Sequence, residues 1–306
     1  MDKLTAGQRD CLRFGAIAAP MVLACGGKGV LWAVPALALA ALADWAVQRR
    51  LPEGRSLAEY LPRWALLLEL LFLVAAAAAI AAMTPLCWPD GSWPLFPLTL
   101  LVLAGAAARP GTGAVGRCGV PVAWGCILFL GLVLAAALPE AKPQPARSWT
   151  EGLPVLTVAL LGVCGRFLPS EREKPGRLWL GLAVFTLPLL ALGKDLRTAV
   201  RSIELFGVLQ RFEALVSCAL TAGLFLSLTL LAASAGEILR ALGLERATGA
   251  IVLFPAAALL FWIAVVPDWV LAAGAGLFWG VLPLLTQGIG GGADGEKSPS
   301  KSEKKC

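Results

Sequence analysis

The chain has 306 residues, of which 58% are hydrophobic and 15% are charged, and its mean hydropathy is +0.77. So few polar side chains could not cover the surface of a water-soluble domain of this length, and the composition therefore predicts an integral membrane protein. The formal net charge of +6 comes from short basic clusters between apolar runs, which favours a topological role over nucleic-acid binding.

Apolar runs follow one another along most of the chain and predict a single membrane domain over residues 1–288. A spanning helix needs roughly 20 apolar residues. The candidate runs are residues 12–25, 30–48, 64–83, 94–108, 118–138, 152–168, 178–193, 213–236, 249–266 and 269–287. The tail, residues 289–306, is rich in Gly, Ser and charged residues, and we expect it to be disordered.

The basic residues are distributed unevenly between the two sides of these ten segments. When the N terminus is placed in the cytoplasm, most of the 26 Lys and Arg residues fall on the cytoplasmic side. The positive-inside rule therefore predicts an all-α polytopic protein of about ten helices with both termini in the cytoplasm.

The first and sixth segments are short and interrupted by Gly and Pro. Ten helices divide into five plus five, and corresponding interrupted helices line the site in transporters built as inverted repeats. We therefore expect a ligand site at these two interruptions, with close helix packing as the alternative role of the small residues. The candidate lining residues are Gly15, Ala16, Pro20, Thr157, Gly162 and Gly165.

Glu69, in "LLLELLFL", is the ionisable residue that lies clearly within an apolar run. A carboxylate at membrane depth predicts ion or proton coupling, and the alternative is a structural carboxylate that snorkels or forms an ion pair. Asp44 and Glu237 lie nearer the ends of their runs and are predicted to be interfacial.

The segment "RTAVRSIELFGVLQRFEALV", residues 197–216, is unusually polar for this chain. Its apolar and charged residues fall on opposite faces at helical spacing, which predicts an amphipathic helix lying in the membrane interface. The next membrane helix is predicted to begin at Glu213. The residues assigned a structural or interface role are Arg201, Glu204, Arg211 and Glu213.

Sequence signals of enzymes are missing. "GGKG", residues 26–29, lacks the spacing and the following Ser or Thr of a P-loop, and no G-x-S-x-G motif occurs. The chain has no His, and its eight Cys residues are scattered without C-x-x-C spacing. The sequence therefore predicts no enzymatic activity, no metal site and no cofactor.

Several short motifs, spread over most of residues 4–245, carry a family resemblance. They are "LTAGQ" before the first segment, "GGKGVLW" after it, "LPEGRSLAEYL" before the third, "AGAAARPGTGAVGRCGVPV" between the fourth and fifth, and "RSIELFGVLQRFEALV" before the eighth. The last of these is the closest match, through its Arg211-Phe212-Glu213 triplet. In this order and spacing the motifs resemble the GerAB-type spore germination permeases, a branch of the amino acid/polyamine/organocation transporter superfamily.

The resemblance implies a LeuT-like fold of two inverted five-helix repeats. It also implies a nutrient-binding subunit of a germinant receptor in the spore inner membrane, a bacterial cytoplasmic membrane. Partners would be a larger membrane subunit and a lipoprotein subunit. We therefore expect a permease-like sensor for an amino acid or similar small molecule, which must bind one conformation better than another. A proton- or cation-coupled amino acid transporter and a non-binding scaffold subunit are the alternatives.

Overall fold

The computed structural model describes residues 4–25, 32–51, 55–88, 95–137, 149–169, 177–192, 212–244 and 246–290, and it is all-α. Ten helical segments follow one another within these ranges. They are α1 (Ala6–Cys25), α2 (Ala33–Arg50), α3 (Arg63–Ala82), α5 (Phe96–Ala108), α6 (Thr112–Ala137), α7 (Leu153–Cys164), α8 (Arg177–Leu192), α10 (Phe212–Ala241), α11 (Arg246–Ile263) and a final rod of α12 (Asp268–Ala275), a π-helical turn (Gly276–Val281) and α13 (Leu282–Gly290). Short helical turns are α4 (Thr84–Cys87), Leu57–Glu59, Trp149–Gly152 and Gly165–Phe167.

Each of the ten predicted segments coincides with one of these helical segments, although several ends differ. Helix α1 begins at Ala6, well before the apolar run at residue 12. A capping box explains this start, because the Thr5 backbone N–H donates to Gln8 Oε1 at 3.1 Å and the Gln8 N–H donates to Thr5 Oγ1 at 3.3 Å. Hydropathy marks only the apolar part of a helix, so it missed this polar first turn.

The surface of the bundle is suited to lipid. Five helices in the described part of the chain are long and apolar enough to cross a membrane, within Arg63–Cys87, Thr112–Leu132, Trp149–Phe167, Ala214–Ala241 and Asp268–Thr286. Large apolar side chains also point outward, including Leu71, Leu132 and Leu180, which are 64%, 68% and 69% exposed. These features indicate an integral membrane protein.

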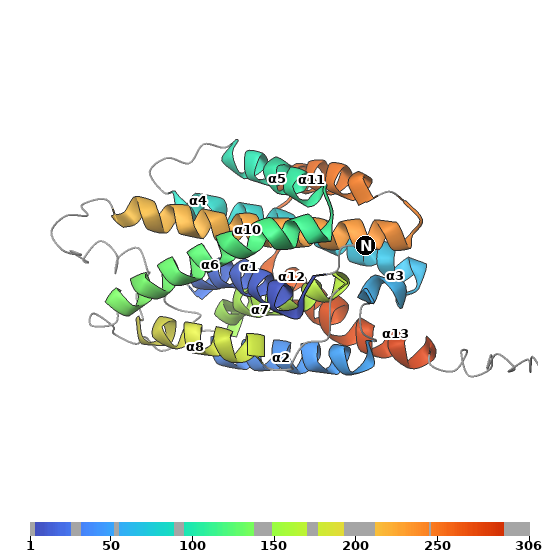
Figure 1. The fold of residues 1–306 in the computed structure, drawn as a ribbon, viewed down its shortest axis with the longest axis horizontal. Helices are drawn as coiled ribbons and strands as arrows, with labels where there is room; N and C mark the ends of the chain where they lie inside the picture. Colours follow the sequence, from blue (N-terminus) through green and yellow to red (C-terminus); the bar gives the residue numbers. More distant parts are fainter. Residues whose placement is uncertain are drawn as a thin grey trace, which may run out of the picture.

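Helix α1 lies in the interior of the bundle, where it packs against α6, α7, α8 and α10. Figure 1 shows α1 and α6 near the middle, with α2 and α8 along one side and α5 and α11 along the other. Glycines allow the closest approaches. A Cβ atom on Gly15 would lie 2.6 Å from Ala123 Cβ, and one on Gly223 of α10 would overlap Ala19 Cβ. Small residues therefore bring these helices together, as is common in membrane bundles.

Two predicted features lie outside the described residues. These are the amphipathic helix containing Arg201, Glu204 and Arg211, and residues 291–306 of the tail. The tail was predicted to begin at residue 289, whereas α13 continues to Gly290. Helix α10 begins at Phe212, next to the predicted start at Glu213.

We expect Gly223→Ala to lower the thermal unfolding midpoint of the detergent-purified protein. Overpacking against Ala19 should cost about 1–3 kcal/mol, more than the roughly 1 kcal/mol that Ala gains over Gly inside a helix. Gly125→Ala on the exposed face of α6 is the matched control, because nothing lies within 4 Å of its added Cβ. Equal midpoints for the two variants would contradict close packing of α1 on α10.

Candidate functional site

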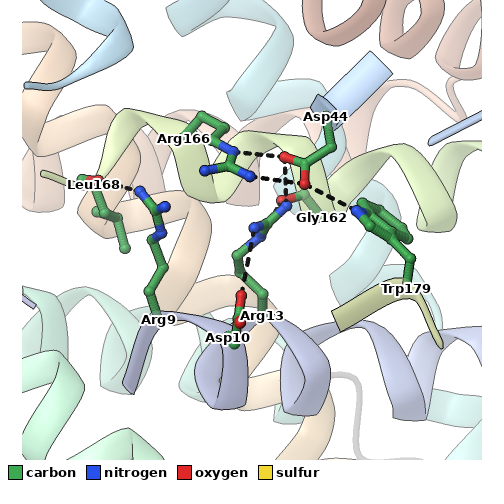
Figure 2. Close-up of polar contacts among 8 residues, drawn as sticks. All are labelled: Arg9, Asp10, Arg13, Asp44, Gly162, Arg166, Leu168 and Trp179. Atoms are coloured by element: carbon green, nitrogen blue, oxygen red, sulfur yellow. Dashed lines mark hydrogen bonds and ion pairs between the residues drawn. The ribbon is translucent and has the colours of Figure 1, made fainter. Parts of the chain in front are cut away.

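Asp44, on α2, lies at the centre of a buried polar cluster, which Figure 2 shows in close-up. Arg166 donates from Nε and Nη2 to the two carboxylate oxygens at 2.6 and 2.9 Å. Arg13 Nη2 donates to Oδ1 at 2.7 Å, and Trp179 Nε1 donates to Oδ2 at 2.9 Å. The cluster of Asp44, Arg13, Arg166 and Trp179 therefore occupies both carboxylate oxygens with donors from three other parts of the chain.

Arg13 extends the cluster to the end of α7. Its Nε donates to the Gly162 carbonyl at 2.6 Å, and its Nη1 lies 3.8 Å from Asp10 Oδ1. Gly165 leaves room for this side chain, because a Cβ there would lie 2.6 Å from Arg13 Cδ. The cluster thus connects α1, α2 and α8 with the C-terminal end of α7.

The charges of this cluster are almost completely removed from solvent. Arg13, Asp44 and Arg166 are 0%, 4% and 2% exposed. Two buried guanidinium groups need nearby negative charge, which Asp44 supplies directly and Asp10 supplies at the edge. With both Asp44 oxygens bonded, the arrangement ties helices together and offers a ligand no open carboxylate.

The interfacial depth predicted for Asp44 and Glu237 stays a prediction, but the exposure expected of interfacial side chains is not found. Both are buried, and Glu237 lies 2.9 Å from Arg240. The prediction used distance from the end of a single apolar run, whereas burial here comes from neighbouring segments. Arg13 and Arg166 were counted only as topology signals. The predicted topology places these two arginines on the same side of the membrane as Asp44, and this was the sequence feature that could have indicated their ion pairs with it.

Asp44→Asn should destabilise the protein by about 3–5 kcal/mol, because it leaves two buried guanidiniums without their central counter-charge. The measurement is the unfolding midpoint in detergent. Glu59→Gln is the control, because it removes a carboxylate that pairs with the partly exposed Arg55 and Arg240 and should cost at most about 1 kcal/mol. Similar losses for both variants would mean that the buried cluster contributes no more than a surface pair.

Glu69, on α3, is buried as well, with 0% exposure. Its Oε1 accepts a hydrogen bond from Trp279 Nε1 at 2.7 Å, and its Oε2 has no hydrogen-bond partner among the described residues. The snorkelling alternative therefore does not hold. Trp279 sits in the π-helical turn, and its ring packs edge-on against Phe72 with a centroid distance of 5.0 Å. Such turns widen a helix locally and are frequent at functional sites.

An apolar cavity of about 380 Å³ lies beside Trp279. It is bounded by α3, α7 and α12 together with the ends of α1 and α11, and this volume falls in the range of small-molecule sites. Its lining includes Ala79, Thr157, Leu161, Phe261, Asp268 and Trp279. The cavity lies where α1 and α3 end and α7 and α12 begin, on the side of the bundle opposite the N terminus.

The structure separates the predicted site residues. Thr157 lines the cavity. Helix α1 continues without a break through Gly15, Ala16 and Pro20, all of which are buried. Gly162 packs against Ile17 and Trp179, and Gly165 packs against Arg13. Only Thr157 of the six therefore meets the cavity, while the three glycines make close packing contacts and Ala16 and Pro20 are buried in the bundle.

A scan against protein-family models finds no match for the chain, and a search of curated proteins finds no similar sequence. The described residues contain no group of three or more His, Cys, Asp and Glu side chains placed to hold a metal ion.

Glu69→Gln should fold with a nearly unchanged midpoint, because an amide oxygen can accept the same Trp279 N–H without placing a charge in an apolar site. Glu69→Ala should lose about 1–3 kcal/mol, since it leaves that buried N–H without an acceptor. Thermal unfolding of the two variants tests this. A strongly destabilised Glu69→Gln protein would show instead that the acidic group itself is required for folding.

Proposed function

We propose that this protein is a permease-like sensor that binds a small-molecule nutrient in the cavity between α3, α7 and α12. By resemblance it would be the nutrient-binding subunit of a spore germination receptor. It would act in the spore inner membrane with a larger membrane subunit and a lipoprotein subunit. The single observation that carries the proposal is a cavity of about 380 Å³ located where the two halves of the chain meet.

A permease-like arrangement is supported by which helices pack together. The first five helices (α1, α2, α3, α5, α6) can be matched in order with the last five (α7, α8, α10, α11, α12). Most packed pairs then have a packed counterpart: α1–α6 corresponds to α7–α12, α3–α5 to α10–α11, α2–α7 to α8–α1, and α5–α10 to α11–α3. Two inverted five-helix repeats related by a twofold axis would produce this correspondence between packed pairs of helices.

One packed pair of helices that lacks a closely packed counterpart identifies the place of the cavity. Helix α1 packs along α10, whereas the counterpart pair, α7 and α3, makes few contacts. Ala79 of α3 and Thr157 and Leu161 of α7 face the cavity that separates them. Sites in inverted-repeat transporters lie at the interface between repeats. A ligand here would touch both halves and could favour one arrangement of them over another.

The buried cluster around Asp44 supports access from one side only. It joins α1, α2, α8 and the end of α7 toward the N-terminal side of the bundle, while the cavity lies toward the other side. With the N terminus in the cytoplasm, as the positive-inside rule predicts, the cavity lies toward the side away from the cytoplasm. An external nutrient would reach a receptor from that side.

A second candidate is a proton- or cation-coupled transporter of amino acids. The observation that favours it is Glu69 Oε2, which is buried and lacks a hydrogen-bond partner among the described residues, behind the cavity-lining Trp279. Substrate uptake into proteoliposomes, dependent on a proton or cation gradient and lost in Glu69→Gln, would favour this candidate over the sensor.

A thermal-shift screen of the detergent-purified protein against amino acids, sugars and nucleosides tests the sensor. A ligand at 100 times its Kd should add about 2.7 kcal/mol of apparent stability. Ala79→Phe should abolish the shift by filling the cavity. Val102→Phe on the exposed face of α5 is the matched control and should retain it. Absence of any stabilising nutrient, or a shift that persists in Ala79→Phe, would contradict a nutrient site in this cavity.

A further inference from the structure

We infer that the cavity selects an apolar molecule carrying an amino group, and that it disfavours a carboxylate. This inference rests on the proposed function, because it takes the cavity as the ligand site and assigns the chemical class of the ligand. It narrows the ligand that the resemblance implies, which is an amino acid or similar small molecule.

The walls of the cavity are almost entirely hydrocarbon. Alanines of α3 form one side, and Leu161 and Phe261 contribute to the others. Three polar or amphipathic side chains, Thr157, Asp268 and Trp279, are found among the described lining residues. The body of a bound ligand must therefore be apolar, since burying further polar groups without partners is unfavourable.

The hydrogen-bond donors of these side chains are already in use. Trp279 donates its only side-chain N–H to Glu69 Oε1 at 2.7 Å. Thr157 donates its hydroxyl hydrogen to the Leu153 carbonyl at 3.0 Å. No Lys, Arg, Asn or Gln side chain lines the described part of the cavity. A ligand carboxylate would therefore find no side-chain donor in the lining.

Acceptors, in contrast, remain. The Thr157 hydroxyl oxygen keeps lone-pair capacity when it acts as a donor. Asp268 begins α12, is exposed, and supplies the acidic side chain of the described lining. The group behind Trp279 is Glu69, which is acidic as well. An ammonium group matches the two acceptors of the described lining, the Thr157 hydroxyl and the Asp268 carboxylate, through charge-assisted hydrogen bonds.

The volume limits the size of the apolar part. A dry apolar cavity of about 150 Å³ holds benzene, so a cavity of about 380 Å³ has room for a phenyl ring with an alkyl chain. Phenethylamine is thus a suitable probe. Its matched relatives are 2-phenylethanol, which lacks the charge, and phenylalanine and 3-phenylpropionic acid, which carry a carboxylate.

The test measures thermal-shift affinities of the four probes for the full-length protein in detergent. Phenethylamine should bind more tightly than the alcohol and at least about tenfold more tightly than either carboxylate. Asp268→Asn should weaken amine binding about tenfold, the loss expected for one charge-assisted hydrogen bond, and leave alcohol binding unchanged. Unchanged alcohol binding also demonstrates that the variant folds. Glu59→Gln, on the turn Leu57–Glu59 outside the lining, is the control for loss of a carboxylate.

The outcomes separate the inference from the proposed function. If a carboxylate probe binds as tightly as the amine and Ala79→Phe abolishes both, the amine selectivity is wrong and the cavity remains a ligand site. Amine binding that is indifferent to Asp268→Asn also overturns the selectivity. If no probe and no nutrient binds, or if binding persists in Ala79→Phe, the ligand site itself is refuted.

Discussion

The burial of two guanidinium groups inside an apolar bundle is the constraint on which the rest of this structure depends. Arg13 and Arg166 can be removed from solvent because Asp44 accepts hydrogen bonds from both of them. This requirement fixes the relative positions of α1, α2 and the end of α7, and Trp179 brings in α8. A pair of charges without that partner would be strongly unfavourable, so the helices that carry them must meet.

The constraint also explains why the two ends of the bundle differ. One end is held by ionic hydrogen bonds, whereas the other is bounded by small side chains and encloses the cavity. The alanine-rich second half of α3 reaches this cavity but fills little of it. Trp279 reaches into the same region from the π-helical turn and connects the cavity wall to Glu69. The buried ionic cluster and the cavity therefore lie at opposite ends of the same bundle of helices.

The helical segments could be predicted from sequence because each depends on local hydropathy, which a single apolar run displays. The contacts of Asp44 could not be predicted this way, since they join positions as far apart as 44 and 179. The arginines gave an ambiguous signal, because positive-inside topology accounts for them equally well. The position of the cavity could not be predicted from the Gly and Pro interruptions. Gly15 and Gly162 make close packing contacts, whereas the cavity lies beside the alanines of α3.

The position of Asp44 on the second helix has a consequence for membrane insertion. Neither α1 nor α2 is among the five described helices that are long and apolar enough to cross a membrane unaided, and charged residues lie within both. The hydrogen bond from Arg13 to Asp44 pairs their opposite charges. This pairing lowers the cost of placing both charges among apolar helices, and Arg166 joins it only after the next four helices, α3, α5, α6 and α7, have been synthesised. In this order of synthesis, the hydrogen bonds from Arg166 stabilise a topology that Arg13 and Asp44 have already established.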